Sequence, residues 1–542
     1  MLTPGQKGLL AAAALIFTLI WFAQLGGRAL YDPDEGRYAE IPREMLSGGD
    51  WVIPHLDGLA YLEKPPLQYW LTALAYEAFG QSEGSARLFT GVCGYLSLVL
   101  VFFTGSRLWG FAAGLRAAML TAASTLFVLL GHQLTLDMAL NFFLLACLAC
   151  FVEAQLRRDS PRAQRAWMLG CWCAAALAVL TKGLIGVLIP ATTLAVYTIW
   201  QRDSRALRLN AGWGSALFAA IALPWFILAA HANAEFLKFF FVREHFQRFL
   251  TPIEHRSEPW WFFIAVLAGG ILPWLPQALG ALGRGWRASA PRGRFDAGRL
   301  LWIWSVFVLV FFSFSDSKLI PYILPAVPTL ALLCAGAGAL RCRPLAAGVL
   351  LSAAAGAGAL AYAGGAWSSG GGHALWVQLE PVLPWTGVLL AAAAIGAATL
   401  LRRGHAPAAL AVQCTGWFLA AATILVGAQR AEALYSSREL GLALEAAAPA
   451  SAALFSVQCY GQSLPYYAGR TLLLVDYRDE FDLGLRQDPA QGIATLAEFA
   501  SRWRALSDGF AVMPMATRDR LAGEGLPMHE VAHSHDRVLV SR

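Results

Sequence analysis

Long apolar stretches recur along the chain and are separated by short polar segments. Each stretch has roughly the 17–25 residues that an α-helix needs to cross a hydrocarbon core of ~30 Å. The pattern therefore predicts a polytopic α-helical membrane protein with about 13 transmembrane helices. The predicted ranges are 8–26, 86–105, 112–131, 137–155, 166–181, 183–200, 211–230, 260–282, 300–315, 319–340, 345–365, 383–401 and 408–428.

The charges between these stretches indicate an orientation. With the N-terminus on the cytoplasmic side, the inward segments hold 18 basic and only three acidic residues. Such an excess of Lys and Arg is typical of cytoplasmic loops. An odd number of spans then places the end of the chain outside. The first stretch follows Lys7 without a small-residue cleavage site, so we expect a retained helix and not a signal peptide.

The composition is typical of a membrane protein and indicates which kinds of partner to expect. Hydrophobic residues make up 57% of the 542 residues and charged residues 14%, which excludes a soluble or disordered chain. The net charge of +6 lies largely in arginines beside the apolar stretches, which indicates membrane lipids and no nucleic acid. Nine cysteines are too few for a disulfide scaffold, and their spacing is not that of a metal site.

The tail beyond about residue 430 has a different pattern. It is richer in charge, and short apolar runs alternate in it with helical segments at 434–447 and 493–506. We therefore predict a transmembrane catalytic domain at 1–428, with outward loops at 27–85 and 231–259, followed by a small α/β domain at 429–542. The strands expected in that domain are Ala452–Gln458, Thr471–Tyr477, Gly509–Pro514 and Arg537–Ser541.

Ionisable residues that orientation does not explain gather on the outward side. A site at the outer membrane–water boundary follows, because such groups are costly near lipid and usually functional. The residues are Asp34, Glu35, Arg37, Glu63, Lys64, Lys182, Glu244, His245, Arg248, His255, Asp316 and Lys318, with Asp137 at the outer end of a span.

The first outward loop offers two adjacent carboxylates. Asp34 and Glu35 follow Pro33 shortly after the first span, which keeps them near the bilayer surface. Helix capping by Asp32 or Asp34 would use one carboxylate and leave another available for chemistry. For the next residues we favour an amphipathic helix lying in the interface. These are Glu40, Arg43 and Glu44.

Cations on three outward segments suit a phosphate group. Lys64 lies between Glu63 and two prolines that stiffen the chain, so it is either a snorkelling lysine or a phosphate ligand. In 236–263, aromatic and basic residues alternate, and this segment contains His245 and Arg248. Interfacial anchoring would also explain that pattern. The corner at 313–325 adds Lys318 and Tyr322.

These residues suggest a cationic pocket for a lipid phosphate, flanked by carboxylates. No cofactor is required, although a divalent metal stays an alternative. Its ligands would be Glu63, His245 and His255, with Glu244 beside them. From these residues alone, we infer either an outward-facing enzyme that acts on an anionic lipid or sugar, or a transporter of such a molecule. A transporter should bury charges at mid-membrane, whereas this chain collects them at one face.

Several segments resemble a known family. DPDEGRYAEIPREML at 32–46 and SGGDWVIPHLDGLAYLEKPPLQYW at 47–70 are similar to the protein O-mannosyltransferase-like membrane glycosyltransferases. Within them, the likeness favours the bacterial branch that moves 4-amino-4-deoxy-L-arabinose onto lipid A. VREHFQRF, EHRSEPWWFF, SDSKLIPYIL and VLTKG resemble further family segments, and the likeness covers roughly residues 8–340.

The resemblance implies a C-class glycosyltransferase fold with a periplasmic α/β domain. It implies an undecaprenyl phosphate-linked sugar as donor, a lipid A phosphate as acceptor, and resistance to polymyxin and cationic peptides. The protein would cross the bacterial inner membrane many times, with its active site facing the periplasm. Two alternatives stay open. One is a related transferase that uses another polyprenyl-linked sugar or a protein acceptor, and the other is a lipid or sugar transporter.

The resemblance also implies roles for individual residues. Asp34 matches the family's essential acidic position, Glu35 is its neighbour, and Asp137 joins them as a catalytic candidate. Contacts to the donor phosphate are expected from Lys64, Arg248, Tyr322 and Lys318. Further substrate contacts are expected from Arg37, Lys182 and Glu63.

Overall fold

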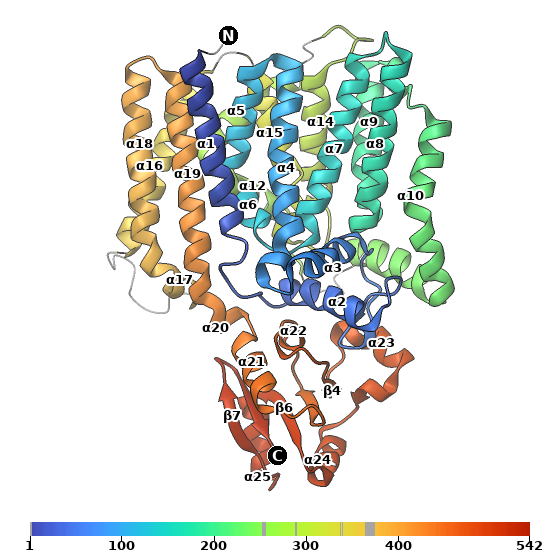
Figure 1. Ribbon diagram of the computed structural model, residues 1–542. Helices are drawn as coiled ribbons and strands as arrows, with labels where there is room; N and C mark the ends of the chain where they lie inside the picture. Colours follow the sequence, from blue (N-terminus) through green and yellow to red (C-terminus); the bar gives the residue numbers. More distant parts are fainter. Residues whose placement is uncertain (1–2, 252–255, 288–289, 337, 339, 364–373) are drawn as a thin grey trace. The chain divides into compact units, whose positions relative to one another are not determined.

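The computed structural model describes residues 3–251, 256–287, 290–336, 338, 340–363 and 374–542 (Figure 1). The chain divides into two compact units. The first comprises Met1–Gln24, Phe89–Gly372 and Glu380–Val426, and the second comprises Leu25–Leu88, His373–Leu379 and Gly427–Arg542. The predicted outward loop at 27–85 therefore belongs to the same compact unit as the tail.

The apolar stretches form helices, which confirms the prediction of a polytopic helical membrane protein. In the described part of the chain, eight helices are long and apolar enough to cross a membrane. They are α1 (Pro4–Ala23), α4 (Glu83–Trp109), α7 (Leu136–Leu156), α8 (Pro161–Lys182), α10 (Ala211–Ala232), α16 (Cys342–Ala363), α18 (Leu383–Arg402) and α19 (Ala406–Ala428).

The remaining predicted stretches are bent or shorter helices. Two are pairs that bend sharply, by 71° between α5 (Phe111–Ala122) and α6 (Thr125–Gly131) and by 83° between α12 (Phe262–Gly270) and the segment Leu272–Gly285. That segment includes α13 (Leu275–Gly285). The shorter apolar helices are α9 (Ile185–Gln201), α14 (Ala297–Ser313), and η4 (Ile320–Ile323) with α15 (Ala326–Gly336).

Glycine separates α8 from α9 where the two predicted stretches touch. Gly183 ends α8 with a φ of +82°, a conformation that favours glycine. A Cβ atom at this position would lie 2.3 Å from Nε2 of His245, so no other residue fits there without rearrangement. This close approach brings the segment 238–247 (η2, Lys238–Gln247) against the end of α8.

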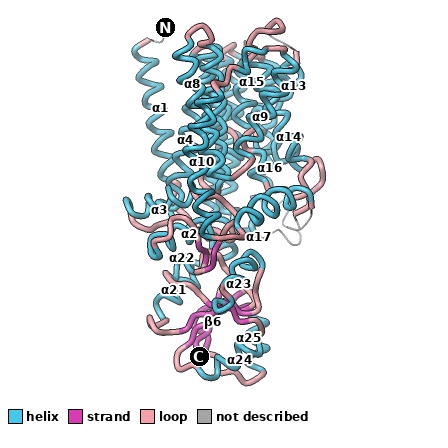
Figure 2. Tube along the Cα trace, turned by 90° about the vertical axis from the view of Figure 1, so that its right-hand side faces the viewer, coloured by secondary structure: helices cyan, strands magenta, loops and turns pink. Residues whose placement is uncertain are grey.

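The strands, magenta in Figure 2, all belong to the second unit. Its main sheet has the order β5-β4-β3-β6-β8-β7, parallel from β5 to β6 and antiparallel at β8 and β7. The bounds are β3 Ala453–Val457, β4 Leu473–Val475, β5 Gly492–Ile493, β6 Gly509–Pro514, β7 His529–His533 and β8 Arg537–Ser541. The flanking helices are α21 (Arg438–Ala447), α22 (Leu464–Ala468), α24 (Leu496–Ala505) and α25 (Met515–Gly523).

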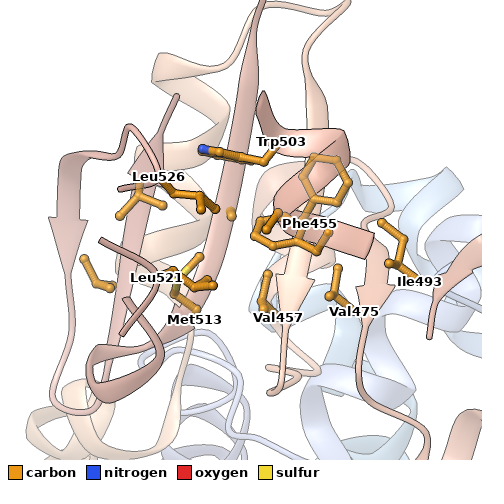
Figure 3. Packing of buried hydrophobic residues seen from close by; sticks show 13 residues of the cluster. Phe455, Val457, Val475, Ile493, Trp503, Met513, Leu521 and Leu526 are labelled. Carbon is orange, nitrogen blue, oxygen red and sulfur yellow. The ribbon is translucent and has the colours of Figure 1, made fainter. Parts of the chain in front are cut away.

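The sheet has an apolar core on each face. Phe455 and Val457 of β3 point toward one cluster with Trp503 of α24 (Figure 3), while Leu454 joins the opposite cluster with Leu440 of α21. This alternation is the period of two expected for a strand covered on both faces. The four predicted strands and the small α/β fold are thus confirmed. The prediction missed β7, which is mostly exposed and carries a polar sequence, and the two-residue β5.

Residues 25–88 form a further part of the second unit. They contain α2 (Asp34–Gly48), a small hairpin of β1 (His55–Leu56) and β2 (Leu59–Ala60), and α3 (Leu67–Phe79). The carboxylate of Asp57 accepts a hydrogen bond from the backbone N–H of Leu472 at 2.7 Å. Because such bonds join it to the tail, this segment is a packed element and not a free loop.

The structure corrects two predictions about α2. Its N-cap residue is Pro33, and no side chain caps it. Asp32 instead accepts hydrogen bonds from the N–H of Ser463 at 2.6 Å and from the hydroxyl of Ser437 at 2.9 Å. The helix also lacks a free polar face, because most of its charged side chains are buried against other parts of the unit. Glu40 pairs with Arg43 at 2.6 Å, and Glu44 accepts from the N–H groups of residues 57 and 58.

Candidate functional site

Glu35 lies in the second unit at the centre of a buried ionic cluster. It is 0% exposed and is held between Arg28 and Arg87. Nε of Arg87 donates to Oε1 at 2.8 Å and its Nη2 donates to Oε2 at 3.0 Å, while Nη2 of Arg28 donates to Oε1 at 2.9 Å. The N–H of Tyr31 donates to the same carboxylate at 3.1 Å. This carboxylate is therefore saturated with donors.

The charge of Glu35 is fixed by these neighbours. Burial alone would raise the pKa of the carboxyl, but the two arginines outweigh burial and hold that pKa well below its usual range. Arg87 also donates to the carbonyls of Leu25, Arg28 and Ala29 at 2.8–2.9 Å, which ties the start of the segment to α4. The sequence analysis missed both arginines. Arg87 could have been recognised from the sequence, since it is a cation inside a predicted apolar stretch.

Asp34, the other predicted carboxylate, has a more open position. Its side chain is 38% exposed, and Oδ1 lies 3.3 Å from Nη1 of Arg37. Arg37 is itself largely buried, pairs with Glu480 at 2.5 Å and lies 5.8 Å from the ring centre of Tyr61. Asp34 therefore shares the Arg37 guanidinium with a second carboxylate, that of Glu480, and its own carboxylate remains partly accessible.

Glu63 and Lys64 lie on the same side of this network. The hydroxyl of Tyr61 donates to Oε2 of Glu63 at 2.9 Å, and that oxygen lies 3.7 Å from Nζ of Lys64. The structure thus links Asp34, Arg37, Glu63 and Lys64 through Tyr61. Burial raises the pKa of Tyr61, so its hydroxyl remains a hydrogen-bond donor at neutral pH.

The close packing of α2 predicts a strict requirement for glycine at position 36. A Cβ atom on Gly36 would lie 2.3 Å from the backbone nitrogen of Ser463, which cannot swing away as a flexible side chain could. We expect Gly36→Ala to lower the melting temperature of the purified protein, since overpacking costs ~1–3 kcal/mol. Gly48→Ala is the matched control, because Gly48 ends the same helix with open space around it. Equal melting temperatures for the two variants would contradict this packing.

In the first unit, three predicted residues meet at one point. Nζ of Lys182, the last residue of α8, lies 2.5 Å from Oδ1 of Asp137 in the first turn of α7. The same ammonium lies 4.7 Å from the ring centre of Tyr322 in η4. Both side chains of the ion pair are mostly buried, with 16% and 11% exposed. A carboxylate and an aromatic face thus hold a lysine at the helix ends.

His245 lies beside this lysine, with both ring nitrogens already engaged. Its Nδ1 is 2.7 Å from the carbonyl of Phe240, and its Nε2 accepts from the N–H of Leu184 at 3.2 Å. Of the other predicted metal ligands, Glu63 belongs to the second unit and His255 lies outside the described residues. The residues that the structure describes contain no group of three His, Cys, Asp or Glu side chains suited to a metal ion.

Arg248 and Lys318 lie on two segments of the first unit that contact each other. Nη1 of Arg248 donates to Oε2 of Glu244 at 3.0 Å, and Nζ of Lys318 donates to the carbonyl of Ser315 at 2.5 Å. Backbone bonds join these segments, from the N–H of Asp316 to the carbonyl of Phe249 and from the N–H of Lys318 to the carbonyl of residue 256. Both cations therefore have intramolecular partners, which a phosphate ligand would have to share.

Each unit, taken by itself, holds a charged group that could take part in chemistry. The first presents a lysine with restrained position, and the second presents a partly exposed carboxylate above a buried ionic cluster. A fixed ammonium suits an oxyanion, and a carboxylate suits a centre that becomes positive.

Comparisons with known proteins give a consistent assignment. The family model of the aminoarabinose transferase C-terminal domain matches residues 440–542, and that of dolichyl-phosphate-mannose-protein mannosyltransferase matches residues 8–240. The undecaprenyl phosphate-alpha-4-amino-4-deoxy-L-arabinose arabinosyl transferase 1 of Sodalis glossinidius is 38% identical over 337 residues. That match covers 61% of this chain but only 58% of the relative.

Solved structures extend the similarity to the whole chain. The crystal structure of ArnT from Cupriavidus metallidurans bound to undecaprenyl phosphate matches with a TM-score of 0.91 and 31% identity, over 99% of this chain and 98% of that one. The oligosaccharyltransferase AglB of Archaeoglobus fulgidus matches with a TM-score of 0.53 and 14% identity over 94% and 70% of the two chains, which shows a shared fold alone. The chain is a multi-pass membrane protein with the C-class glycosyltransferase fold, and it belongs to the aminoarabinose transferase family.

Proposed function

We propose that this protein transfers 4-amino-4-deoxy-L-arabinose from undecaprenyl phosphate to the phosphate groups of lipid A. The observation that carries the proposal is the match along almost the entire chain to an ArnT structure that binds undecaprenyl phosphate. The names of the curated relatives support the same sugar. The site would face the periplasm from the inner membrane, and the product would carry fewer negative charges, which gives resistance to polymyxin and other cationic peptides.

The donor phosphate needs cations as it departs from the sugar. We assign this role first to Lys182, because its ammonium is already restrained by Asp137 and by the ring of Tyr322. A preorganised charge stabilises a developing phosphate without having to reorganise during the reaction. Asp137 would then act as a positioning residue that aims the lysine. Lys64, Arg248 and Lys318 are further candidates, each of which would exchange an internal contact for the phosphate.

The sugar needs a negative charge as its anomeric centre becomes positive. Asp34 is the carboxylate suited to this role, since it is partly exposed and has one neighbouring cation, Arg37. Glu35 is saturated by two arginines and would support the fold instead. An oxocarbenium-like state next to a carboxylate is the general pattern of glycosyl transfer. A lipid A phosphate is already an anion at neutral pH, so the acceptor requires little help from a base.

Loss of the Lys182 charge should weaken use of the donor. A charged hydrogen bond contributes ~1.5–3 kcal/mol, so Lys182→Gln should raise the KM for the polyprenyl-linked donor roughly 10- to 150-fold. Lys238→Gln is the matched control, because Lys238 is an exposed lysine of the same unit. Steady-state kinetics with varied donor measures both variants. An unchanged KM and kcat for Lys182→Gln would remove this lysine from the donor site.

The match to a protein mannosyltransferase model favours a second function, transfer from a polyprenyl phosphate to a protein hydroxyl. One assay separates the two functions. The purified protein is incubated with the aminoarabinose donor, lipid A and a hydroxyl-rich peptide. The mass of each acceptor is then measured by mass spectrometry. The proposal expects a sugar on lipid A alone. A sugar on the peptide alone would support the second function.

A further inference from the structure

The first unit holds a cavity lined by several polar side chains, at the far end of α15 from Tyr322. It is lined by Arg116 of α5, Gln277 and Arg284 of α13, and Arg341 just before α16, among other residues. Tyr322 precedes α15, whereas the cavity reaches Cys334 near the end of this helix. At a rise of ~1.5 Å per residue, the helix separates the two places by about 15 Å. The cavity is therefore distinct from the donor residues described above.

The cavity has positive charges without a counter-ion. Three arginines and no carboxylate line it. Across the residues that the structure describes, none of these guanidinium groups forms an ion pair, and Arg116 donates to the carbonyl of Ala335 at 3.1 Å. Arg116 belongs to α5, which is half of a bent candidate span. An arginine stays charged and is costly within a membrane unless something pairs with it, so this cavity favours an anion.

Individual polar atoms of two cavity side chains also lack hydrogen-bond partners among the described residues. Both amide atoms of Gln277 and Nε of Arg116 are buried without a partner. Buried polar atoms are normally satisfied, so these atoms indicate a missing molecule. An anionic oxygen would satisfy the N–H groups, whereas Oε1 of Gln277 needs a donor such as a hydroxyl. The combination suits a phosphodiester that carries a hydroxyl group.

The size and place of the cavity agree with a lipid headgroup. The cavity volume is about 40 Å³, which exceeds the ~10–15 Å³ that a single water needs. Arg284 and Arg341 lie at the ends of apolar helices, in the arginine-rich segments that the charge pattern places at the cytoplasmic face. Basic pockets between membrane helices on that side commonly bind anionic lipids.

We propose that Arg116, Gln277, Arg284 and Arg341 bind the phosphodiester headgroup of an anionic phospholipid such as phosphatidylglycerol. This lipid site is separate from the transfer reaction and does not rest on the proposed substrates. Its occupation would stabilise the ends of α5, α13 and α16, whose residues line the same cavity.

The test uses the full-length protein, delipidated in a neutral detergent. Phosphatidylglycerol, phosphatidylcholine or inorganic phosphate is added, the melting temperature is followed, and bound lipid is counted by native mass spectrometry. We expect phosphatidylglycerol alone to raise the melting temperature and to remain bound as one copy. Arg284→Gln should weaken this binding at least tenfold, as loss of a charged hydrogen bond does.

Matched arginines provide the control. Arg287→Gln and Arg343→Gln remove a charge within a few residues of Arg284 and Arg341, but neither residue lines the cavity. These variants should bind the lipid as the unmodified protein does. An equal loss in the control variants, or an equal effect of phosphatidylcholine, would overturn the proposal. An equal effect of inorganic phosphate would assign the site to a soluble anion and overturn the lipid assignment.

Salt offers a second measurement if Arg284→Gln yields too little protein. An arginine–phosphate contact at a partly open cavity weakens as ionic strength rises. Binding of phosphatidylglycerol to the unmodified protein should therefore fall between 0.05 M and 0.5 M sodium chloride. Binding that is the same at both salt concentrations would contradict an ionic headgroup site.

Discussion

Asp34→Asn should lower turnover by two to three decades while leaving the amount of folded protein almost unchanged. The substitution keeps the shape of the side chain and removes its charge. If the carboxylate stabilises positive charge on the sugar, the barrier rises by ~3–4 kcal/mol. Stability should hardly change, because the side chain is 38% exposed and its contact with Arg37, at 3.3 Å, is that of a partly solvated pair.

The measurement pairs activity with yield for the same preparation. Modified lipid A is quantified from cells that produce Asp34→Asn, and the protein is extracted in detergent and quantified beside the unmodified form. Near-normal modification at normal yield would refute the catalytic role. A lost fold would instead show that Asp34 is a structural residue.

Glu35→Ala should have the opposite profile, with a severe loss of folded protein. The substitution leaves Arg28 and Arg87 buried without their carboxylate, and removing one partner of a buried ion pair costs ~3–5 kcal/mol. Since many proteins are stable by only ~5–15 kcal/mol, this loss should be visible in both yield and melting temperature. Glu77→Ala is the matched control, because Glu77 is an exposed glutamate on α3 in the same unit.

A second substitution tests the reason for that loss. The variant Arg87→Met should also destabilise the protein, because Glu35 then keeps only one of its two arginines. Joint replacement by Glu35→Leu and Arg87→Met removes opposite charges together and should cost less than the two single changes added. Additive losses would show that the two side chains do not act as a pair.

The membrane part of the fold follows from local patterns, and so it was predictable. A helix across a membrane needs only a continuous apolar stretch, and charged ends give its orientation. The strands around Val457 and Val512 likewise follow from short apolar runs. The polar edge strand β7 lacks that signal, because most of its side chains face away from a core.

The grouping of 25–88 with the tail could not be predicted from a local pattern. It depends on contacts between residues about 400 positions apart, such as Asp57 with Leu472 and Asp32 with Ser463. For the same reason the local pattern favours Asp32 or Asp34 as a helix cap, although the Asp32 carboxylate bonds to the tail. Residue types did select Asp34, Asp137 and Lys182, but only the structure shows that Glu35 is enclosed by arginines and that Lys182 is paired.

The most direct test of the central claim is the mass of lipid A from a bacterial strain that makes the aminoarabinose donor but lacks its own transferase. Cells producing this protein should gain lipid A species that carry 4-amino-4-deoxy-L-arabinose on a phosphate. Cells with the empty vector, or with the Asp34→Asn protein at equal yield, should show almost none. Unmodified lipid A in cells that contain the folded protein and the donor would contradict the account.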